Sequence, residues 1–141
     1  MMDLIELELI SSVAPAETVR IKEIYIPASL GLTGVLSHHL PYLTLIESGE
    51  VYYLDKDDRA HYLYIEEGFL EVANNKAVLI SDSITRAEDL DRAAIEAGLK
   101  KAEKTIKDSL ALAAQINPDD LDQALRDQRL YRLQLSLLAK I

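Results

Sequence analysis

The sequence predicts an α+β protein, in which an N-terminal antiparallel β-sandwich is followed by a C-terminal antiparallel α-helical hairpin. Residues 1–85 consist of short β-branched and aromatic runs separated by turn residues, a pattern typical of antiparallel sheets. Residues 86–141 contain one glycine and one proline, and strong helix formers dominate them. We therefore expect a sandwich domain over 1–85 and a two-helix domain over 86–141.

The strands of the first domain are predicted from alternation and from turn residues. Residues 4–10 and 20–25 alternate with a period of two, and a Pro/Gly-rich bend is expected to begin at Pro27. A hairpin is expected where the charged residues 55–58 connect two tyrosine-rich runs. Asn74-Asn75 predicts a second, tight hairpin because asparagine accepts positive φ.

The helices of the second domain are predicted from apolar residues that recur every three or four positions. In the first helix, which is expected to end near Ala114, these are Ile95, Leu99, Ala102, Ile106, Leu110 and Ala113. Thr85 and Glu88 have the spacing of a capping box at its start, with Asp89 as an alternative cap. Asn117-Pro118 predicts the cap and first turn of the second helix. The short break between the helices predicts an antiparallel hairpin.

This hairpin is expected to be weakly held by its own contacts. Its first helix is rich in alanine, which offers little apolar surface, and burial contributes roughly 25 cal/mol per Å². Two such helices that face only each other bury too little to be robust. The hairpin therefore either rests permanently on the sandwich or exchanges between partner surfaces as a switch, and the residues alone leave both open.

Composition argues against several classes of function. The net charge is −9, and residues 1–85 hold 14 acidic and 5 basic residues, so binding to nucleic acid is not expected. No apolar run reaches 18 residues, so no membrane span is predicted, and the acidic N-terminus is unlike a signal peptide. Because the chain has no cysteine, it has no disulfides and no thiolate chemistry.

The residues that could carry chemistry form no recognisable catalytic constellation. The histidines at 38, 39 and 61 match no metal-binding or triad spacing, and the sequence has no phosphate-binding loop. Two other classes of function stay open. One is a free-standing binding module that holds a small ligand in a pocket lined by Tyr52, Tyr53, Tyr62 and Tyr64. The other is an enzyme that uses His39 with a nearby carboxylate.

A set of three arginines stands out on the second predicted helix. Arg126, Arg129 and Arg132 recur every third residue, so they form a slanting arginine stripe. Arginine binds carboxylates and phosphates through paired hydrogen bonds. The stripe fits either docking to an acidic partner or anion, or a solvated face balanced by Asp122 and Asp127.

The order of motifs resembles the epsilon subunit of F-type ATP synthases over nearly the full length. The segments that carry the resemblance are Ile26-Pro27, Gly31, Thr33-Gly34-Val35-Leu36, His39-Leu40-Pro41-Tyr42-Leu43-Thr44, Gly68-Phe69-Leu70-Glu71-Val72, Asn75, Val78-Leu79 and Arg86-Ala87-Glu88-Asp89-Leu90-Asp91. The resemblance implies a non-catalytic rotor subunit that couples ion flow to ATP synthesis. It implies a peripheral position on the cytoplasmic side of the cell inner membrane or on a plastid thylakoid. The implied partners are the gamma subunit, the c-ring and the alpha/beta catalytic head, where the two helices can inhibit ATP hydrolysis.

The resemblance also implies roles for individual residues. Leu30, Leu32, His38 and His39 are expected at the contact with the c-ring and the gamma subunit, where an apolar pair replaces a bend that is often acidic in the family. The arginine stripe is expected to meet an acidic loop of the beta subunit. Some bacterial members bind ATP through an Ile/Leu-Asp-x-x-Arg-Ala motif, but Ala94-Ile95 occupies the Arg-Ala positions here. We therefore expect this chain to bind no ATP and no other cofactor or metal.

Overall fold

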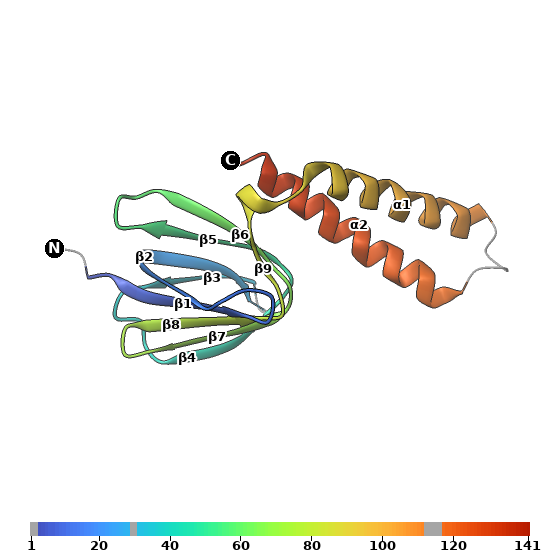
Figure 1. The fold of residues 1–141 in the computed structure, drawn as a ribbon. Coiled ribbons are helices and arrows are strands. Elements are labelled where there is room, and N and C mark those ends of the chain that lie inside the picture. The colour runs from blue at the N-terminus through green and yellow to red at the C-terminus, as the bar shows by residue number, and fades with distance from the viewer. Residues whose placement is uncertain (1–2, 29–30, 112–116) are drawn as a thin grey trace. The chain divides into compact units, whose positions relative to one another are not determined.

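The structure, a computed structural model, describes residues 3–28, 31–111 and 117–141 (Figure 1). The chain divides into two compact units after Ala87. The first unit contains the strands, and the second contains two long helices.

Nine strands in the described residues form one continuous hydrogen-bonded sheet that folds into a sandwich. They are β1 (Ile5–Ser11), β2 (Glu17–Ala28), β3 (Gly31–Leu36), β4 (Tyr42–Ile46), β5 (Gly49–Asp55), β6 (Ala60–Ile65), β7 (Gly68–Ala73), β8 (Lys76–Ser81) and β9 (Ile84–Arg86). Their order is β1-β8-β7-β4-β2-β5-β6-β9, and β3 pairs with β2. The long strand β2 belongs to both layers, because its first half pairs with β1 and its second half with β3 and β5.

The predicted β-sandwich is confirmed, but two of its features differ from the sequence prediction. The pairing of β1 with β8 is parallel, whereas every other pairing among the described strands is antiparallel as expected. The antiparallel pair expected on either side of the Pro/Gly-rich bend is present as β2 and β3, but the predicted start of the bend at Pro27 was wrong. Strand β2 continues through Pro27, which is the register partner of Leu32, and the Pro27 carbonyl accepts a hydrogen bond from Glu47 N (3.0 Å). Proline is tolerated in a strand where the ladder needs no N–H.

Both predicted hairpins are confirmed. Strands β5 and β6 pair across the charged turn, in which Asp58 has a φ of 61°. Strands β7 and β8 pair across Asn74 and Asn75, whose φ angles are 53° and 59°. Two successive residues with positive φ give the turn that matches the twist of paired strands.

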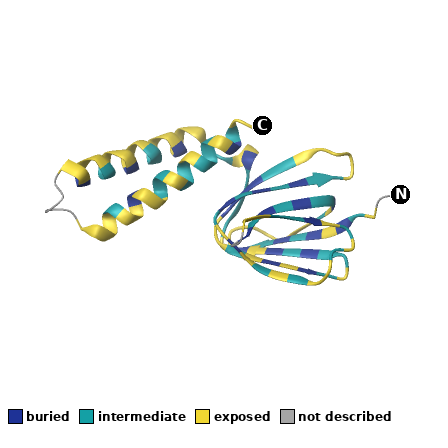
Figure 2. Ribbon diagram, turned by 180° about the vertical axis from the view of Figure 1, so that it is seen from behind, coloured by how far each residue is buried: buried dark blue, intermediate teal, exposed yellow. Residues whose placement is uncertain are grey.

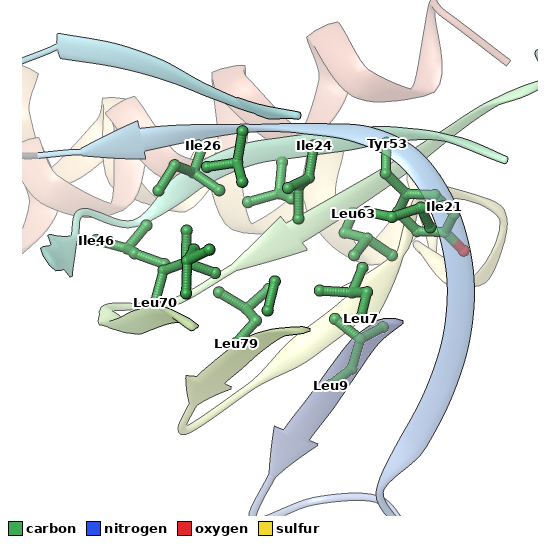
Figure 3. Close-up of a cluster of buried hydrophobic side chains, with 14 of the residues drawn as sticks. Leu7, Leu9, Ile21, Ile24, Ile26, Ile46, Tyr53, Leu63, Leu70 and Leu79 are labelled. Carbon is green, nitrogen blue, oxygen red and sulfur yellow. The ribbon is translucent and has the colours of Figure 1, made fainter. Parts of the chain in front are cut away.

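The sandwich core is filled by aliphatic side chains from both layers (Figure 3). Buried and exposed residues alternate along most strands, as Figure 2 shows. Tyr53 is 1% exposed and belongs to this core, and Tyr64 is also buried. Tyr52 instead stacks on Tyr25 on the outer surface, with 4.7 Å between ring centroids, and Tyr62 packs beside it. The structure therefore contradicts the interpretation in which the four tyrosines line one ligand pocket.

The division between the units falls within a short 3₁₀ helix η1 (Ala87–Asp89), and the second unit contains α1 (Arg92–Ala111) and α2 (Pro118–Leu138). The capping box predicted for α1 was wrong: Thr85 lies in β9, paired with Tyr64, and Asp91 caps the helix by accepting from Ala94 N (3.2 Å). The prediction for α2 is confirmed, since Asn117 Oδ1 accepts from Asp119 N (3.0 Å) and the proline occupies the first turn.

The apolar face of the helical unit is thin, as predicted. The buried residues of the two helices are Ile95, Ala102, Ser109, Ala124 and Leu137, of which three are alanine or serine. Leu110, predicted to face inward, is exposed, and the predicted positions Ala113 and Ala114 lie outside the described residues.

Candidate functional site

A row of exposed apolar side chains crosses the outer surface of four neighbouring strands, β1, β8, β7 and β4. Ile10 is the register partner of Ile80, Ile80 of Phe69, and Phe69 of Leu45. Ile80 is 44% exposed, Phe69 51% and Leu45 58%, while Ile10 is half-buried. These four residues form the outer apolar row, and Leu43 extends it along β4.

The row arises because these strands are apolar on both faces. Leu45-Ile46, Phe69-Leu70 and Leu79-Ile80 are adjacent apolar pairs, and successive residues of a strand point to opposite faces. One member of each pair fills the core, so the other must face outward. The row was not predicted from the sequence, although these adjacent apolar pairs were the available signal. Contiguous exposed apolar surface of this kind marks a protein-interaction site.

A hollow of about 720 Å³ lies at the row, and its rim is acidic. The residues that line it include Glu47, Glu67 and Asp82, all of which are exposed. Apolar side chains surrounded by carboxylates suit a partner segment that presents apolar residues flanked by lysine or arginine.

Gly68 shapes the floor of this hollow. A Cβ at position 68 would lie 2.0 Å from the carbonyl oxygen of Ile80, so no side chain fits between β7 and β8 at this point. The absence of a side chain lets the two strands approach closely and keeps Phe69 and Ile80 adjacent.

The described residues that were predicted to contact the c-ring and the gamma subunit lie in β3 and in the connection from β3 to β4. Leu30 lies outside the described residues, and Leu32 is 70% exposed in β3. His38 and His39 lie in the connection between β3 and β4 and not on a strand. His38 has a φ of 60°, and its N–H donates to Asn75 Oδ1 (2.9 Å).

The two histidine rings have different surroundings. His38 Nε2 lies 2.5 Å from a carboxylate oxygen of Asp3. His39 Nδ1 lies 2.7 Å from the Leu40 carbonyl oxygen, and its ring packs on Tyr42, the first residue of β4. His39 therefore contacts a carbonyl and an aromatic ring where the enzyme alternative needs a carboxylate.

All three members of the arginine stripe are exposed on α2, but they have different surroundings. Arg126 donates to Gln123 Oε1 (2.9 Å) on the same helix. Arg132 forms an ion pair across the hairpin with Glu103 of α1 (3.6 Å). Within the described parts of the chain, no ion pair or hydrogen bond holds the Arg129 guanidinium.

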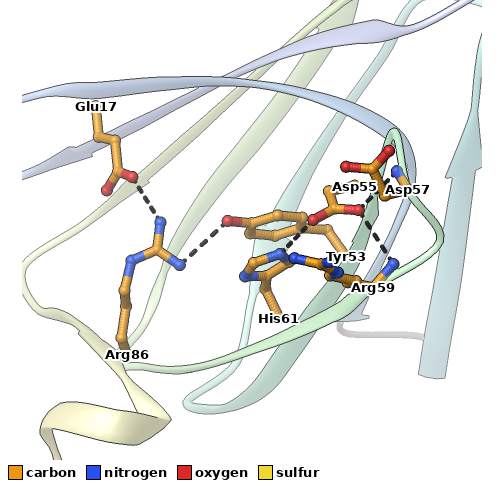
Figure 4. Close-up of polar contacts among 7 residues, drawn as sticks. All are labelled: Glu17, Tyr53, Asp55, Asp57, Arg59, His61 and Arg86. Carbon is orange, nitrogen blue, oxygen red and sulfur yellow. Dashed lines mark hydrogen bonds and ion pairs between the residues drawn. The ribbon is translucent and has the colours of Figure 1, made fainter.

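A polar network fixes the end of the sandwich where the chain leaves it (Figure 4). The Arg86 guanidinium donates to Tyr53 Oη (3.1 Å) and to Glu17 Oε1 (2.6 Å), which joins β9 to β5 and β2. Burial opposes the charge on Arg86, but the hydrogen bonds to Tyr53 and Glu17 outweigh it and raise the pKa of Arg86.

A second polar group closes the turn between β5 and β6. Asp55 Oδ2 lies 2.8 Å from His61 Nε2, and Asp55 Oδ1 accepts from the backbone N–H groups of Asp57 (2.8 Å) and Arg59 (3.0 Å). The hydrogen bond from His61, followed by that from Arg59, lowers the pKa of Asp55 to about 2.

In the described residues, no group of three or more His, Cys, Asp or Glu side chains is placed to hold a metal ion. None of the helices there is both long and apolar enough to cross a membrane.

The family profile described as ATP synthase, Delta/Epsilon chain, beta-sandwich domain matches residues 4–87. The chain belongs to this ATP synthase delta/epsilon family. The matched segment covers nearly the whole strand unit, including the outer apolar row and the Arg86 network.

Several curated members of the family are similar to this chain. It is 36% identical over 81 residues to the ATP synthase epsilon chain of Desulfosudis oleivorans, covering 57% of this chain and 61% of that one. It is 34% identical over 85 residues to the ATP synthase epsilon chain of Dichelobacter nodosus, covering 60% and 59%. These alignments span about three fifths of each relative. The similarity to the epsilon chain of Geotalea daltonii, at 28% identity over 140 residues, covers 96% of both chains.

Solved structures share the fold of this family member at low sequence identity. A chain in the mitochondrial ATP synthase of Euglena gracilis matches 96% of this chain and 81% of its own length, with a TM-score of 0.78 and 16% identity. A chain in the central stalk and c-ring of the Tetrahymena thermophila mitochondrial ATP synthase matches with a TM-score of 0.56 and 10% identity.

Proposed function

We propose that this chain is the epsilon subunit of an F-type ATP synthase, a non-catalytic part of the rotating central stalk that couples ion flow to ATP synthesis. Membership of the delta/epsilon family is the observation that carries the proposal. The alignment with the Geotalea daltonii epsilon chain extends the support to the helical unit, because it covers 96% of both chains.

The sandwich holds the subunit on the rotor. The outer apolar row with its acidic rim is the surface for the gamma subunit, because it offers apolar area and negative charge together. The segment that carries Leu30, Leu32, His38 and His39 faces the c-ring. Its exposed leucine at 32 and the ordered connection at the two histidines support this second surface.

The helical unit regulates ATP hydrolysis in the alpha/beta head through the arginine stripe. Arg129 is exposed and holds no partner in the described residues, and Arg126 and Arg132 are exposed beside it. Charge reversal at all three arginines is expected to abolish inhibition of hydrolysis while sparing binding to gamma. Inhibition that persists in the triple variant would contradict this role.

The proposed position is peripheral, on the cytoplasmic side of the cell inner membrane or on a plastid thylakoid, held there through the complex. We also propose that the chain binds no ATP. Ala94-Ile95 replaces the Arg-Ala of the ATP-binding motif, and the Asp91 carboxylate caps α1. Titration with ATP, followed by NMR of the helical residues, tests this: saturable shifts in α1 and α2 would contradict it.

Co-purification with the gamma subunit of the same enzyme is the decisive test of the proposed function. The full chain is expected to form a stable complex with gamma. A variant that ends after Ala87 is expected to retain that complex, because the sandwich has its own filled core, and to lose inhibition of ATP hydrolysis. Failure of the full chain to bind gamma would refute the assignment.

A further inference from the structure

The two helices of the second unit approach closely where Tyr131 of α2 crosses Gly98 of α1. A Cβ at position 98 would lie 2.5 Å from Cζ of Tyr131, 2.7 Å from its hydroxyl oxygen and 2.8 Å from Cε2. These separations are too short for real atoms, so the ring occupies the space that a side chain at 98 would take. Gly98 is a notch in α1, and the Tyr131 ring fills it.

The notch is notable because glycine weakens a helix interior relative to alanine. Gly98 is the one glycine in residues 86–141, and it lies inside a helix otherwise rich in strong helix formers. The buried residues on either side of the crossing are Ile95 and Ala102 on α1, and Ala124 and Leu137 on α2, so each helix has one large apolar residue on one side and one alanine on the other. Tyr131 on Gly98 adds a large side chain to this thin apolar face.

The residue that follows Tyr131 belongs to the arginine stripe. Arg132 is paired with Glu103 of α1 at 3.6 Å, five residues beyond the notch. Ion pairs of this exposure contribute little by themselves, so the pair forms because the helices are already held together. While the Tyr131 ring fills the notch, Arg132 of the arginine stripe therefore stays paired with Glu103 of α1.

We propose that the Gly98 notch and the Tyr131 ring form a latch that holds the hairpin closed and keeps Arg132 on Glu103. When the ring leaves the notch, the thin remaining apolar face no longer holds the helices together, and Arg132 is released for other carboxylates. The closed state is a property of the isolated chain. The consequence for docking rests on the proposed function of the stripe.

The test measures the distance between the helices in the full chain. Because the chain has no cysteine, cysteines introduced at the exposed positions Lys104 and Asp122 can be spin-labelled selectively for pulsed EPR. The key variant is Gly98→Leu, since leucine is a good helix former whose side chain fills the notch and excludes the ring. Alanine would meet only the tip of the ring, which can rotate away. The matched control is Ala97→Leu, which adds the same type of side chain at an exposed position of α1.

Gly98→Leu is expected to raise the population with widely separated labels by roughly tenfold, whereas Ala97→Leu leaves the wild-type distribution unchanged. Tyr131→Ala alone is expected to open the hairpin as well. The double variant Gly98→Leu with Tyr131→Ala is expected to close again, because the introduced leucine takes the space of the missing ring. A Gly98→Leu distribution equal to that of wild type or of Ala97→Leu overturns the latch. So does a double variant as open as Gly98→Leu.

The functional consequence is measured separately with the assembled ATPase. If the proposed function holds, Gly98→Leu inhibits ATP hydrolysis at several-fold lower concentration than wild type, because Arg132 is free. Unchanged inhibition together with an open EPR distribution would count against the role of the stripe and leave the latch standing. A closed EPR distribution would refute the latch whatever the ATPase shows.

Discussion

If the outer apolar row is the gamma surface that we propose, replacing Phe69 by alanine should weaken binding to the gamma subunit by an amount that the structure allows us to estimate. A phenylalanine side chain offers about 200 Å² of surface, and 51% of Phe69 is exposed, so a partner can cover roughly 100 Å². At about 25 cal/mol per Å², and with part of that area retained by alanine, the loss is roughly 2 kcal/mol. This corresponds to an increase in Kd of about thirtyfold.

The assay is isothermal titration of purified gamma with Phe69→Ala and with a matched control, Leu36→Ala. Leu36 is 55% exposed on β3, in the other layer of the sandwich, so its truncation removes similar exposed apolar area away from the outer apolar row. The fold is expected to survive both changes, because neither side chain is part of the core. Equal Kd values for the two variants, or an unchanged Kd for Phe69→Ala, would refute the assignment of the row to gamma.

Three further changes test the architecture. Gly68→Ala should lower the free energy of unfolding by roughly 3 kcal/mol, since its Cβ would meet the Ile80 backbone at 2.0 Å; a wild-type midpoint in urea would contradict this. Asp55→Asn should destabilise the sandwich above about pH 4 and progressively less toward pH 2. The lowered pKa of Asp55 stabilises the fold fully above the unfolded value of 3.8, and this stability is lost as the pH falls to the folded value of about 2. A stability difference that is constant from pH 6 to pH 2, measured by denaturant titration, would argue against it. Asn117→Ala should cost about 1 kcal/mol by removing the cap of α2, and circular dichroism melting of the helical signal that matches wild type would rule this out.

Local features of the chain could be predicted because they depend on neighbouring residues. Asn74-Asn75 fixes a hairpin turn through its own φ preference, and Asn117-Pro118 begins a helix through one side-chain hydrogen bond. The capping box at Thr85 failed because a non-local pairing competed with it. Thr85 joins β9 opposite Tyr64, and α1 begins only at Arg92, so Thr85 lies too far before that helix to cap it.

The candidate site could not be predicted in the same way, because its residues come together only through strand order. Ile10 and Ile80 are adjacent through a parallel pairing of strands that are far apart in the sequence, and nothing in either strand indicates that pairing. Leu45 and Phe69 meet because β4 pairs with β7. Taken alone, each strand is an apolar run that could be covered on both faces.

The two side-chain hydrogen bonds of Arg86 have a mechanical consequence. Arg86 is the last residue of β9, and its guanidinium is bound to side chains on β2 and β5, which are distant in sequence. Because Arg86 joins β9 to β2 and β5, a force that acts on the chain from the helices is shared by these three strands before it can separate β9 from β6. A pull on the helical unit is thus expected to leave the core of the strand unit in place.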